Sequence, residues 1–599
     1  MSTHDRRTAP AADPFVTAPA EPASSIPGAE AIAQSLKAAG IEMVFGYTGG
    51  ASSAFTPALF LSNMPNIGGR TETTASWMSY GYNRVKRRAA SAVMTWAVGS
   101  LHTSPIVYAA KLDSTPLMLI SIDNPPSFEA RDLLQDSVEM YSVMKPISKY
   151  IKKVTDAGDL PVVIRQAVKE ASTGRFGPSF LAISQPTAFQ KTSMKIEPLT
   201  LPAPPSADPA DIAAVWKFLT AAERPVLYVG AGVQIADAAA ELRELAELLG
   251  VPVVSTSWGG RGILVDDHPL YCGPSGNFGW RGANDTLQQA DFWLAIGLSF
   301  SQMSTGSWSL KKPSTVVHVD IDQHELAKIF QPSLGIQSDA KKFLSQLVAY
   351  ARNTGAGALK NKLESWRAET AKIKEEWLVD MHAWVESDGP PINQYFLIDT
   401  LSKELPDDAL VVADSGAHAF AFYRFYNYRT SMPLAMGSRY MSLGAGLPVA
   451  IGAKLADPSR TVVCYHGDGG FYYDFMELSN LHQHNLKLIV VLDNNRCLLA
   501  NRAGARMRGV PNPWADLPDT DFVTVARGMG VEGERVDRPE DLAPAIRRAL
   551  AAERSYFLDV RTDPDMRLVR AIKDMIPIVG DRVPKAGHTA IDIEGSWPS

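Results

Sequence analysis

The hydrophobic pattern of the chain is one of alternating strand and helix units. Short apolar runs rich in β-branched and aromatic residues recur along most of the sequence, and amphipathic stretches separate them. The clearest unit has strand-like runs at 461–465 and 486–492. Between these runs, one amphipathic helix is predicted by the helical spacing of Phe471, Phe475, Leu478 and Leu481. A strand–helix–strand unit of this size closes as a right-handed parallel crossover, so both loops should lie at the same sheet edge.

Polar residues with a defined chemistry follow both strands of this unit. Asp468 lies among Gly467, Gly469 and Gly470 after the first strand, and Asn495 follows the second. The glycines allow a tight turn at a helix start, where free backbone N–H groups suit a phosphate. A carboxylate and an amide oxygen are ligands that suit Mg²⁺. The pattern therefore predicts a diphosphate bound through Mg²⁺, and the alternative is a glycine-rich turn followed by a chance pair of asparagines.

This spacing resembles the thiamine-diphosphate (ThDP) motif of the superfamily that contains pyruvate oxidase, acetolactate synthase and related decarboxylases. The resemblance implies that Asp468, Asn495 and the backbone carbonyl of Cys497 bind Mg²⁺. It also implies a second half-site, and Glu72, ahead of the Gly-Tyr-x-Arg segment 81–84, stands where the family has its glutamate. Such a carboxyl group bonds N1′ of the aminopyrimidine and favours the tautomer that removes the proton from thiazolium C2. Taken alone, Glu72 would be an ordinary carboxylate at a helix start.

Three further segments match the family in its order along the chain. Segment 414–418 resembles a second phosphate-binding turn, in which Gly416, Ala417 and His418 face the diphosphate. Segment 442–448 resembles the stretch whose bulky apolar residue, here Leu443, supports the bent cofactor. Segment 45–50 resembles the acetolactate synthase turn with Thr48 in place of proline, which assigns Thr48 and Gly49 to cofactor binding. Each match alone is a weak turn or core signal.

The resemblance implies an α/β fold with three doubly wound parallel-sheet domains. A length of 599 residues with 46% apolar content is enough to bury several cores. We expect disorder at 1–27, a pyrimidine-binding domain at 28–190, a central Rossmann-like domain at 206–355 and a diphosphate- and Mg²⁺-binding domain at 390–565. We expect the tail, 566–599, to be either a lid over the active site or an arm on a neighbouring subunit.

Composition narrows the class of protein. The net charge of −6 is mild and indicates neither a nucleic-acid nor an anionic-membrane partner. Three scattered cysteines are too few for a disulfide framework or a thiolate metal site. No apolar run in the sequence reaches membrane-spanning length. A cytoplasmic enzyme is the resulting expectation.

The central domain leaves its cofactor open. The segment 230–232 has two glycines after a strand and ahead of a helix-like stretch at 236–249, but the third glycine of a dinucleotide fingerprint is missing. In the family this domain holds FAD, ADP or no nucleotide. Segments 273–280 and 320–322 are similar to FAD-containing relatives, so a flavoprotein with structural FAD stays an alternative.

Within the superfamily, the nearest resemblance is to the acetolactate synthase-like branch containing cyclohexane-1,2-dione hydrolase. Gly, Ser and Ala stand in segments 50–53 and 96–97, where that hydrolase has histidines, which argues against cleavage of a cyclic dione. Compared with acetolactate synthase, His102 replaces an asparagine, whereas Gln135 matches the active-site glutamine. We expect His102 and Gln135 to orient the donor carbonyl or to pass a proton to the acceptor, since histidine titrates near neutrality. A histidine satisfied within the core is the alternative for His102.

The resemblance implies a carboligase or lyase of the transketolase type. Its donor would be a small 2-oxo acid or a 1,2-diketone, and its acceptor an aldehyde or ketone. The alternatives are a 2-oxo acid decarboxylase, a 1,2-diketone hydrolase and, in another class, a ThDP-binding regulatory subunit without catalysis. Because the family assembles its site between the two ThDP domains of different subunits, we expect a homodimer at minimum and a homotetramer as the assembled state.

Overall fold

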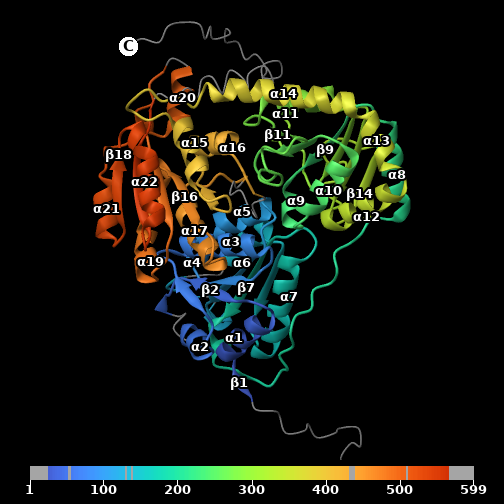
Figure 1. Ribbon diagram of the computed structural model, residues 1–599. Helices are drawn as coiled ribbons and strands as arrows, with labels where there is room; N and C mark the ends of the chain where they lie inside the picture. Colours follow the sequence, from blue (N-terminus) through green and yellow to red (C-terminus); the bar gives the residue numbers. More distant parts are fainter. Residues whose placement is uncertain are drawn as a thin grey trace, which may run out of the picture.

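Three parallel β-sheets, one in each third of the chain, organise the molecule (Figure 1). The computed structural model describes residues 25–50, 55–128, 131–135, 139–430, 439–507 and 510–564. The sheets have six, six and five strands, and every strand pairing within them is parallel. The predicted fold class, α/β with three parallel-sheet domains, is therefore confirmed.

The N-terminal sheet changes direction of winding between β2 and β4. Its strand order is β3 (Asn66–Gly68), β2 (Met43–Gly46), β4 (Ser91–Trp96), β5 (Leu117–Asp123), β7 (Pro178–Ser184) and β6 (Tyr150–Val154). Its helices are α1 (Gly28–Ala38), α2 (Thr56–Leu61), α3 (Glu72–Lys86), α4 (Gly99–His102), α5 (Ser104–Leu112), α6 (Met140–Met144) and α7 (Leu160–Ser172). In open parallel sheets, ligands bind beyond the carboxyl ends of the strands at such a reversal.

The central sheet has the same kind of reversal, between β9 and β12. Its strand order is β11 (Tyr271–Ser275), β10 (Val253–Thr256), β9 (Pro225–Val229), β12 (Phe292–Ile296), β13 (Thr315–Asp320) and β14 (Leu334–Gln337). Its helices are α8 (Pro209–Ala221), α9 (Ala231–Ile235), α10 (Ala239–Leu249), α11 (Arg281–Gln289), α12 (Ala340–Asn353) and α13 (Ala356–Lys362). Helix α14 (Glu364–His382) then crosses the top of the view toward the C-terminal sheet (Figure 1).

The C-terminal sheet places the predicted crossover unit at its centre. Its strand order is β15 (Leu410–Ala413), β16 (Val462–Gly467), β17 (Ile489–Asn494), β19 (Tyr556–Arg561) and β18 (Glu532–Val536). Its helices are α15 (Gln394–Glu404), α16 (Ala417–Phe425), α17 (Gly446–Ala456), α18 (Asp468–Phe471), α19 (Leu478–Gln483), α20 (Leu499–Met507), α21 (Phe522–Gly528) and α22 (Pro539–Ala551).

The prediction of one helix between β16 and β17 is wrong. The chain forms α18, a 3-10 turn at Phe475–Glu477 and α19 instead. The break falls at Asp474, whose buried carboxylate accepts from the backbone N–H of Leu447 at 3.1 Å and lies 3.0 Å from His466 Nε2. The apolar spacing correctly predicted buried side chains, since Phe471 and Leu478 are fully enclosed. It could not predict the polar contacts of Asp474, which interrupt the helix.

Close packing of α3 against α17 joins the N- and C-terminal sheets. Gly81 on α3 lies against the backbone of Val449, and Gly452 on α17 lies against the backbone of Met78. A Cβ atom at either glycine would overlap that backbone, so glycine permits the two helices to approach. Helix α3 begins at Glu72, so this contact also fixes the position of that residue relative to the C-terminal sheet.

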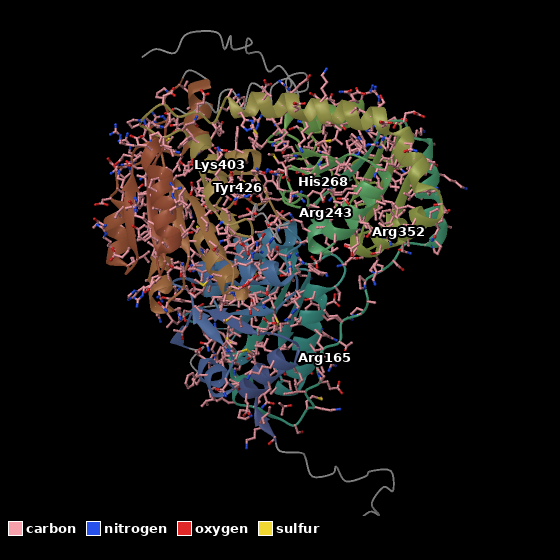
Figure 2. All side chains as sticks on the ribbon, in the orientation of Figure 1. Arg165, Arg243, His268, Arg352, Lys403 and Tyr426 are labelled. Atoms are coloured by element: carbon pink, nitrogen blue, oxygen red, sulfur yellow. The ribbon has the colours of Figure 1, made fainter. Side chains whose placement is uncertain are left out.

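A buried ion pair joins the central and C-terminal domains. Arg261 is fully buried, pairs with Asp266 and donates to the backbone oxygens of Tyr423 and Tyr426. Figure 2 labels Tyr426 and His268 near this junction, and Arg352 on the outer side of the central domain. Lys374 of α14 donates to the backbone oxygen of Asp266 at 2.7 Å, which ties the linking helix to the same junction.

The two ends of the chain are described only in part. Ile26–Pro27, which we expected within a disordered N-terminus, form strand β1 and pair with β8 (Lys191–Thr192), because Ile26 packs on the core of the N-terminal domain. Residues 1–24 and the tail 566–599 lie outside the described residues. Within the described part of the chain, no helix is both long and apolar enough to cross a membrane.

Candidate active site

The carboxyl edge of the N-terminal sheet gathers the predicted residues of the first half-site. Glu72 follows β3, the turn with Thr48 and Gly49 follows β2, and His102 ends the short helix after β4. Gln135 lies in the segment after β5. Thr48 and Gln135 are exposed and Gly49 is half-buried. The topology thus brings residues from four separate loops to one edge.

Glu72 is the first residue of α3 and is held in place by its surroundings. Thr71 caps the helix, accepting a hydrogen bond from Thr74 N–H at 3.1 Å. The Glu72 side chain is 15% exposed, and its Oε1 lies against Gly99, where a Cβ atom would overlap it. His102 Nδ1 lies 3.1 Å from Glu72 Oε2. The carboxyl group is thus enclosed on two sides and still reaches solvent.

The structure gives His102 and Gln135 different partners. His102 contacts Glu72, and its backbone oxygen accepts from Thr73 Oγ1 at 2.9 Å. Gln135 Oε1 instead accepts from the indole N–H of Trp96 at 2.8 Å. The His102 side chain is 68% exposed, so it is not a core histidine. The contact between Glu72 and His102 was not foreseen, because residues so far apart in sequence show no pattern that would pair them.

The carboxyl edge of the C-terminal sheet gathers the second half-site. Asp468 follows β16, Asn495 and Cys497 follow β17, and the segment with His418 follows β15. Asp468 is 3% exposed, its Oδ1 accepts from Gly469 N–H at 2.7 Å, and its Oδ2 is buried with no hydrogen-bond partner in the described chain. Burial and the nearby Asp493 carboxylate raise the pKa of Asp468 to about 7. The backbone N–H groups of Gly469, Arg496 and Cys497 lower it, but by less.

Asn495 lies beside Asp468 on a strained turn. Its side-chain oxygen accepts from the backbone N–H of Cys497 at 3.1 Å, and the Cys497 thiol lies 3.2 Å from the same oxygen. The intervening Arg496 has a φ of +57°, in the left-handed region. Burial raises the pKa of the Cys497 thiol to about 12, so it stays protonated and only its backbone oxygen is a candidate ligand.

The glycines of this edge serve close packing. None of Gly467, Gly469 and Gly470 has a positive φ, contrary to the expected role in a tight turn. A Cβ atom at Gly467 would lie 2.7 Å from the His418 ring, and one at Gly470 would overlap the Asp414 carboxylate. The sequence pattern placed these glycines at the sheet edge, as the structure does. Glycine is needed there because side chains are crowded beneath the loop.

Gly416 and His418 form the second turn of this edge. Gly416 has a φ of +147° and directly precedes α16, whose first residue is Ala417. His418 is buried, its Nε2 has no hydrogen-bond partner in the described chain, and burial lowers its pKa to about 4. A neutral imidazole with a free nitrogen is thus available at this turn.

Asp414, the first residue of segment 414–418, also belongs to this site, although the sequence pattern assigned it no role. Its buried carboxylate accepts from the N–H groups of Ala445 and Gly446 at 2.9 Å and of Gly444 at 3.2 Å. These bonds fix the loop that carries Leu443, which is half-buried. Its position at the end of β15, directly ahead of Ser-Gly, is the signal that could have identified it.

The donor set fits a divalent cation and a diphosphate. Asp468 Oδ2 is a buried carboxylate oxygen without a partner, and such a group is costly unless a cation pairs with it. Oxygen ligands of this kind suit Mg²⁺, which also takes phosphate oxygens. No cluster of three or more His, Cys, Asp or Glu side chains suited to a metal occurs in the described ranges. A cation here would therefore need backbone and ligand oxygens besides Asp468 and Asn495.

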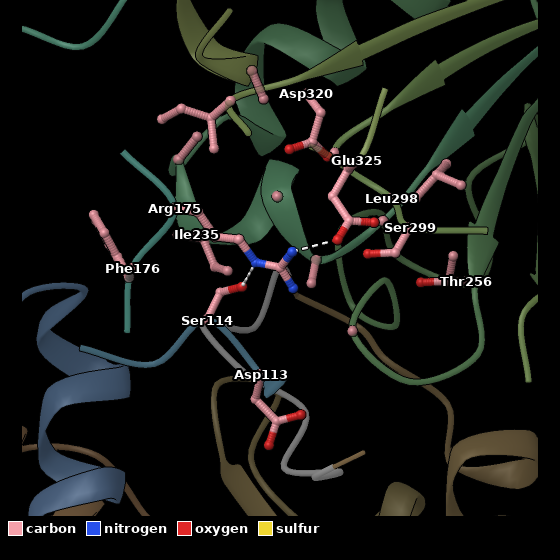
Figure 3. A pocket seen from close by; sticks show the side chains of 18 of the residues that line it. Asp113, Ser114, Arg175, Phe176, Ile235, Thr256, Leu298, Ser299, Asp320 and Glu325 are labelled. Atoms are coloured by element: carbon pink, nitrogen blue, oxygen red, sulfur yellow. Dashed lines mark hydrogen bonds and ion pairs between the residues drawn. The ribbon is translucent and has the colours of Figure 1, made fainter. Parts of the chain in front are cut away.

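A separate large cavity lies where the three domains meet. Its volume is about 950 Å³, and its walls include the carboxyl ends of β9 and β12 in the central sheet. Figure 3 shows Arg175 of the N-terminal domain directed into it, between Ser114 and Glu325. Arg175 Nε donates to Ser114 Oγ at 2.9 Å, and burial raises the pKa of the nearby Asp320 carboxyl to about 6. Gly230 and Gly232 lie against Gly297 at its edge.

Comparison with known proteins agrees with this arrangement. Models of the thiamine pyrophosphate enzymes match in order: the N-terminal TPP binding domain at residues 26–143, the central domain at 212–347 and the C-terminal TPP binding domain at 414–560. The chain is 31% identical over 556 residues to probable acetolactate synthase 2, chloroplastic, of Oryza sativa subsp. japonica, covering 89% of this chain and 82% of that protein.

Two prokaryotic relatives are similar over the same extent. The probable acetolactate synthase large subunit of Methanocaldococcus jannaschii is 29% identical over 568 residues, which cover 90% of this chain and 92% of that protein. The acetolactate synthase isozyme 2 large subunit of Escherichia coli is 29% identical over 552 residues, which cover 90% and 95%. The chain therefore belongs to the ThDP-dependent enzymes of the acetolactate synthase family.

Asp468→Asn should have opposite effects on the stability of the fold and on cofactor binding. Because the pKa of Asp468 lies above that of an unfolded aspartate, its ionisation destabilises the fold; this cost is absent below about pH 4 and complete above about pH 7. Without Mg²⁺, the variant should be more stable than the parent at pH 8, by on the order of 1–3 kcal/mol, and equally stable at pH 4. Thermal unfolding measures both.

In the same variant, Mg²⁺-dependent ThDP binding should weaken by about 100-fold or more, since an ionised ligand is lost. Asp537→Asn is the matched control, because Asp537 is 58% exposed and its removal should change neither property. Lower stability of Asp468→Asn at pH 8, or unchanged ThDP affinity by calorimetry, would contradict the assignment.

Proposed function

We propose that this protein is a carboligase or lyase that takes an acyl unit from a small 2-oxo acid or 1,2-diketone and transfers it to an aldehyde or ketone. The main support is that the chain has both Glu72, at the edge of one sheet, and Asp468, whose Oδ2 has no partner in the described chain, at the edge of another. A protein that only bound the cofactor would need the second group and not the first. When bound, ThDP supplies the carbon nucleophile and the electron sink.

The chain's own residues have distinct tasks in this proposal. Asp468 and Asn495, with the backbone carbonyl of Cys497, would hold Mg²⁺, while His418 and the adjacent glycines would bind phosphate oxygens. Glu72 would hold a proton at N1′ of the pyrimidine, and His102, 3.1 Å away and exposed, offers a path for that proton to solvent. Leu443 would support the cofactor from below.

The proposed branch is the one that contains cyclohexane-1,2-dione hydrolase. It rests on local similarities at 77–86, 278–285 and 317–320. Ala97, at the end of β4, offers no group that could activate a water molecule. Transfer of the acyl unit to a carbonyl acceptor is for this reason preferred to hydrolysis of a cyclic dione.

An incubation with purified protein, ThDP and Mg²⁺ tests the reaction. Pyruvate and butane-2,3-dione would be offered separately, with and without benzaldehyde, and products identified by mass spectrometry. We expect a mixed hydroxyketone, because an acceptor carbonyl can capture the acyl carbanion equivalent. Glu72→Gln is the control and should lose activity by at least ~100-fold, since the proton at N1′ has no other holder.

The other outcomes separate the alternatives. Free acetaldehyde without a mixed product would identify a 2-oxo acid decarboxylase. Free acetate from the diketone would identify a hydrolase. Tight ThDP binding with no product from any donor would contradict an enzymatic role and favour a regulatory subunit.

We propose further that each active site is shared between two subunits. No hydrogen bond or ion pair recorded for the described residues joins Glu72 or His102 to Asp468 or Asn495. Large apolar side chains beside the site loops are exposed to solvent, at 39% or more of their surface: Tyr47, Leu101, Leu134, Tyr440 and Tyr473. Apolar groups gathered around a polar site indicate a surface that another chain covers.

Mixing of two inactive variants tests the shared site. Glu72→Gln and Asp468→Asn chains, refolded together, should regain roughly a quarter of parental activity, because half of the dimers would be mixed and each would have one intact site. A chain with both substitutions, mixed with Glu72→Gln, should regain none. Failure of the first mixture to recover activity, with mixed dimers shown by affinity tags, would contradict the shared site.

The cavity between the domains is proposed to hold a flavin dinucleotide as a structural cofactor. Its volume of about 950 Å³ suits a ligand larger than a mononucleotide, and it opens at the reversal point of the central sheet. At equal concentrations, FAD should raise the thermal unfolding midpoint more than ADP, since it fills more of the cavity. At 100 times its Kd, FAD should stabilise the fold by about 2.7 kcal/mol. No shift with either nucleotide, and no flavin in the purified protein, would contradict the proposal.

A further inference from the structure

Trp96 and Gln135 form a hydrogen bond that has no role in the proposed reaction as described above. Trp96 is the last residue of β4, and Gln135 lies in the segment after the neighbouring strand β5. The indole Nε1 of Trp96 lies 2.8 Å from Gln135 Oε1. Trp96 is only 7% exposed, whereas Gln135 is exposed. A buried, rigid group therefore holds one end of an accessible amide.

The chemistry of the indole decides which way the amide points. An indole N–H can donate a hydrogen bond but cannot accept one. The Gln135 atom that faces Trp96 must then be the amide oxygen. The amide NH₂ group is left on the other side, and it makes no hydrogen bond recorded for the described chain. Gln135 is thus presented as a donor.

The backbone of Gln135 is held as well. Asn124 Nδ2 donates to the Gln135 carbonyl oxygen at 2.8 Å, and Gln135 has a φ of +58°, which is costly for a residue with a side chain. The Trp96 side chain also lies beside Gly49, where a Cβ atom would be 3.6 Å away. The ring therefore spans from the turn assigned to the cofactor to the amide of Gln135.

We propose that Trp96 is a positioning residue that fixes the Gln135 amide as a hydrogen-bond donor to the donor substrate. The inference rests on the proposed function, because it places the substrate carbonyl at this sheet edge. An NH₂ group recognises a carbonyl or carboxylate oxygen, which both a 2-oxo acid and a 1,2-diketone have next to the reacting carbon. Trp96 thereby selects donors with two adjacent oxygen acceptors over simple aldehydes.

Four variants separate this role from general packing. Trp96→Phe keeps the ring and removes the N–H. Gln135→Met removes the amide, and Gln135→Glu keeps an acceptor for Trp96 but has no NH₂ to offer the substrate. Trp366→Phe is the matched control, since it removes a comparable indole bond, 3.0 Å to the Pro225 backbone oxygen, far from the site.

Donor binding and turnover are both measured. Binding uses methyl acetylphosphonate, a pyruvate analogue that cannot lose its phosphonate group, titrated into the enzyme loaded with ThDP and Mg²⁺. For Trp96→Phe, we expect KM for the donor and the analogue Kd to rise about 10-fold, with kcat and ThDP affinity little changed. Gln135→Met and Gln135→Glu should lose at least as much, and Trp366→Phe should match the parent.

The double variant Trp96→Phe/Gln135→Met should be no worse than Gln135→Met alone, because the indole acts only through the amide. Additive losses, or an unchanged KM in Trp96→Phe, would overturn the inference. Failure of the parent to bind the analogue or to use any donor would overturn the proposed function instead. In that case the contact is tested by itself, because Gln135→Met should shift the NMR signal of the Trp96 indole N–H; an unchanged signal would refute the contact.

Discussion

Burial of carboxylates beneath one sheet edge is the constraint on which the C-terminal half-site depends. Asp414, Asp468, Asp474 and Asp493 are all nearly or fully enclosed. Asp414 is satisfied by backbone N–H groups, Asp493 by Tyr465 and other side chains, and Asp474 by His466, whose pKa the two adjacent carboxylates raise to about 9 against the effect of its burial. A positive His466 lies beside Asp414 and Asp474 and offsets one of these charges. Two of these carboxylates keep a buried oxygen without a hydrogen-bond partner in the described chain, Asp468 Oδ2 and Asp474 Oδ1. Asp474 is paired with His466, so the charge of Asp468 is the one that a cation would offset.

Parallel sheet topology determines which side chains gather at the edge of the N-terminal sheet. Side chains beyond the carboxyl ends of parallel strands gather at one edge, so Glu72, His102 and Gln135 share an edge although they come from different loops. The packing of α3 on α17 fixes this edge relative to the C-terminal sheet in the same chain. The exposed apolar residues around both edges support the proposal that a second chain covers the site.

The family resemblance implied the three sheets and the place of Glu72. The apolar runs, which are local signals, placed Asp468 and Asn495 at the ends of two neighbouring strands. The sequence could not predict the break at Asp474, which depends on a histidine and a backbone N–H from other elements. It also grouped His102 with Gln135, whereas the structure gives them separate partners. Such contacts join residues that are far apart in the chain, and a single sequence shows no local pattern that would predict them.

The same reasoning explains why the indole of Trp96 matters more than its hydrophobicity suggests. As the last residue of a buried strand, Trp96 is expected simply to fill the core, and its low exposure agrees with that role. A buried polar N–H must nevertheless find an acceptor, and the acceptor it finds is a side chain that reaches solvent. Packing therefore fixes the ring, and the ring fixes the amide oxygen, which leaves the NH₂ group of the amide to donate elsewhere. The tightly packed core thus sets the orientation of the Gln135 amide at the surface.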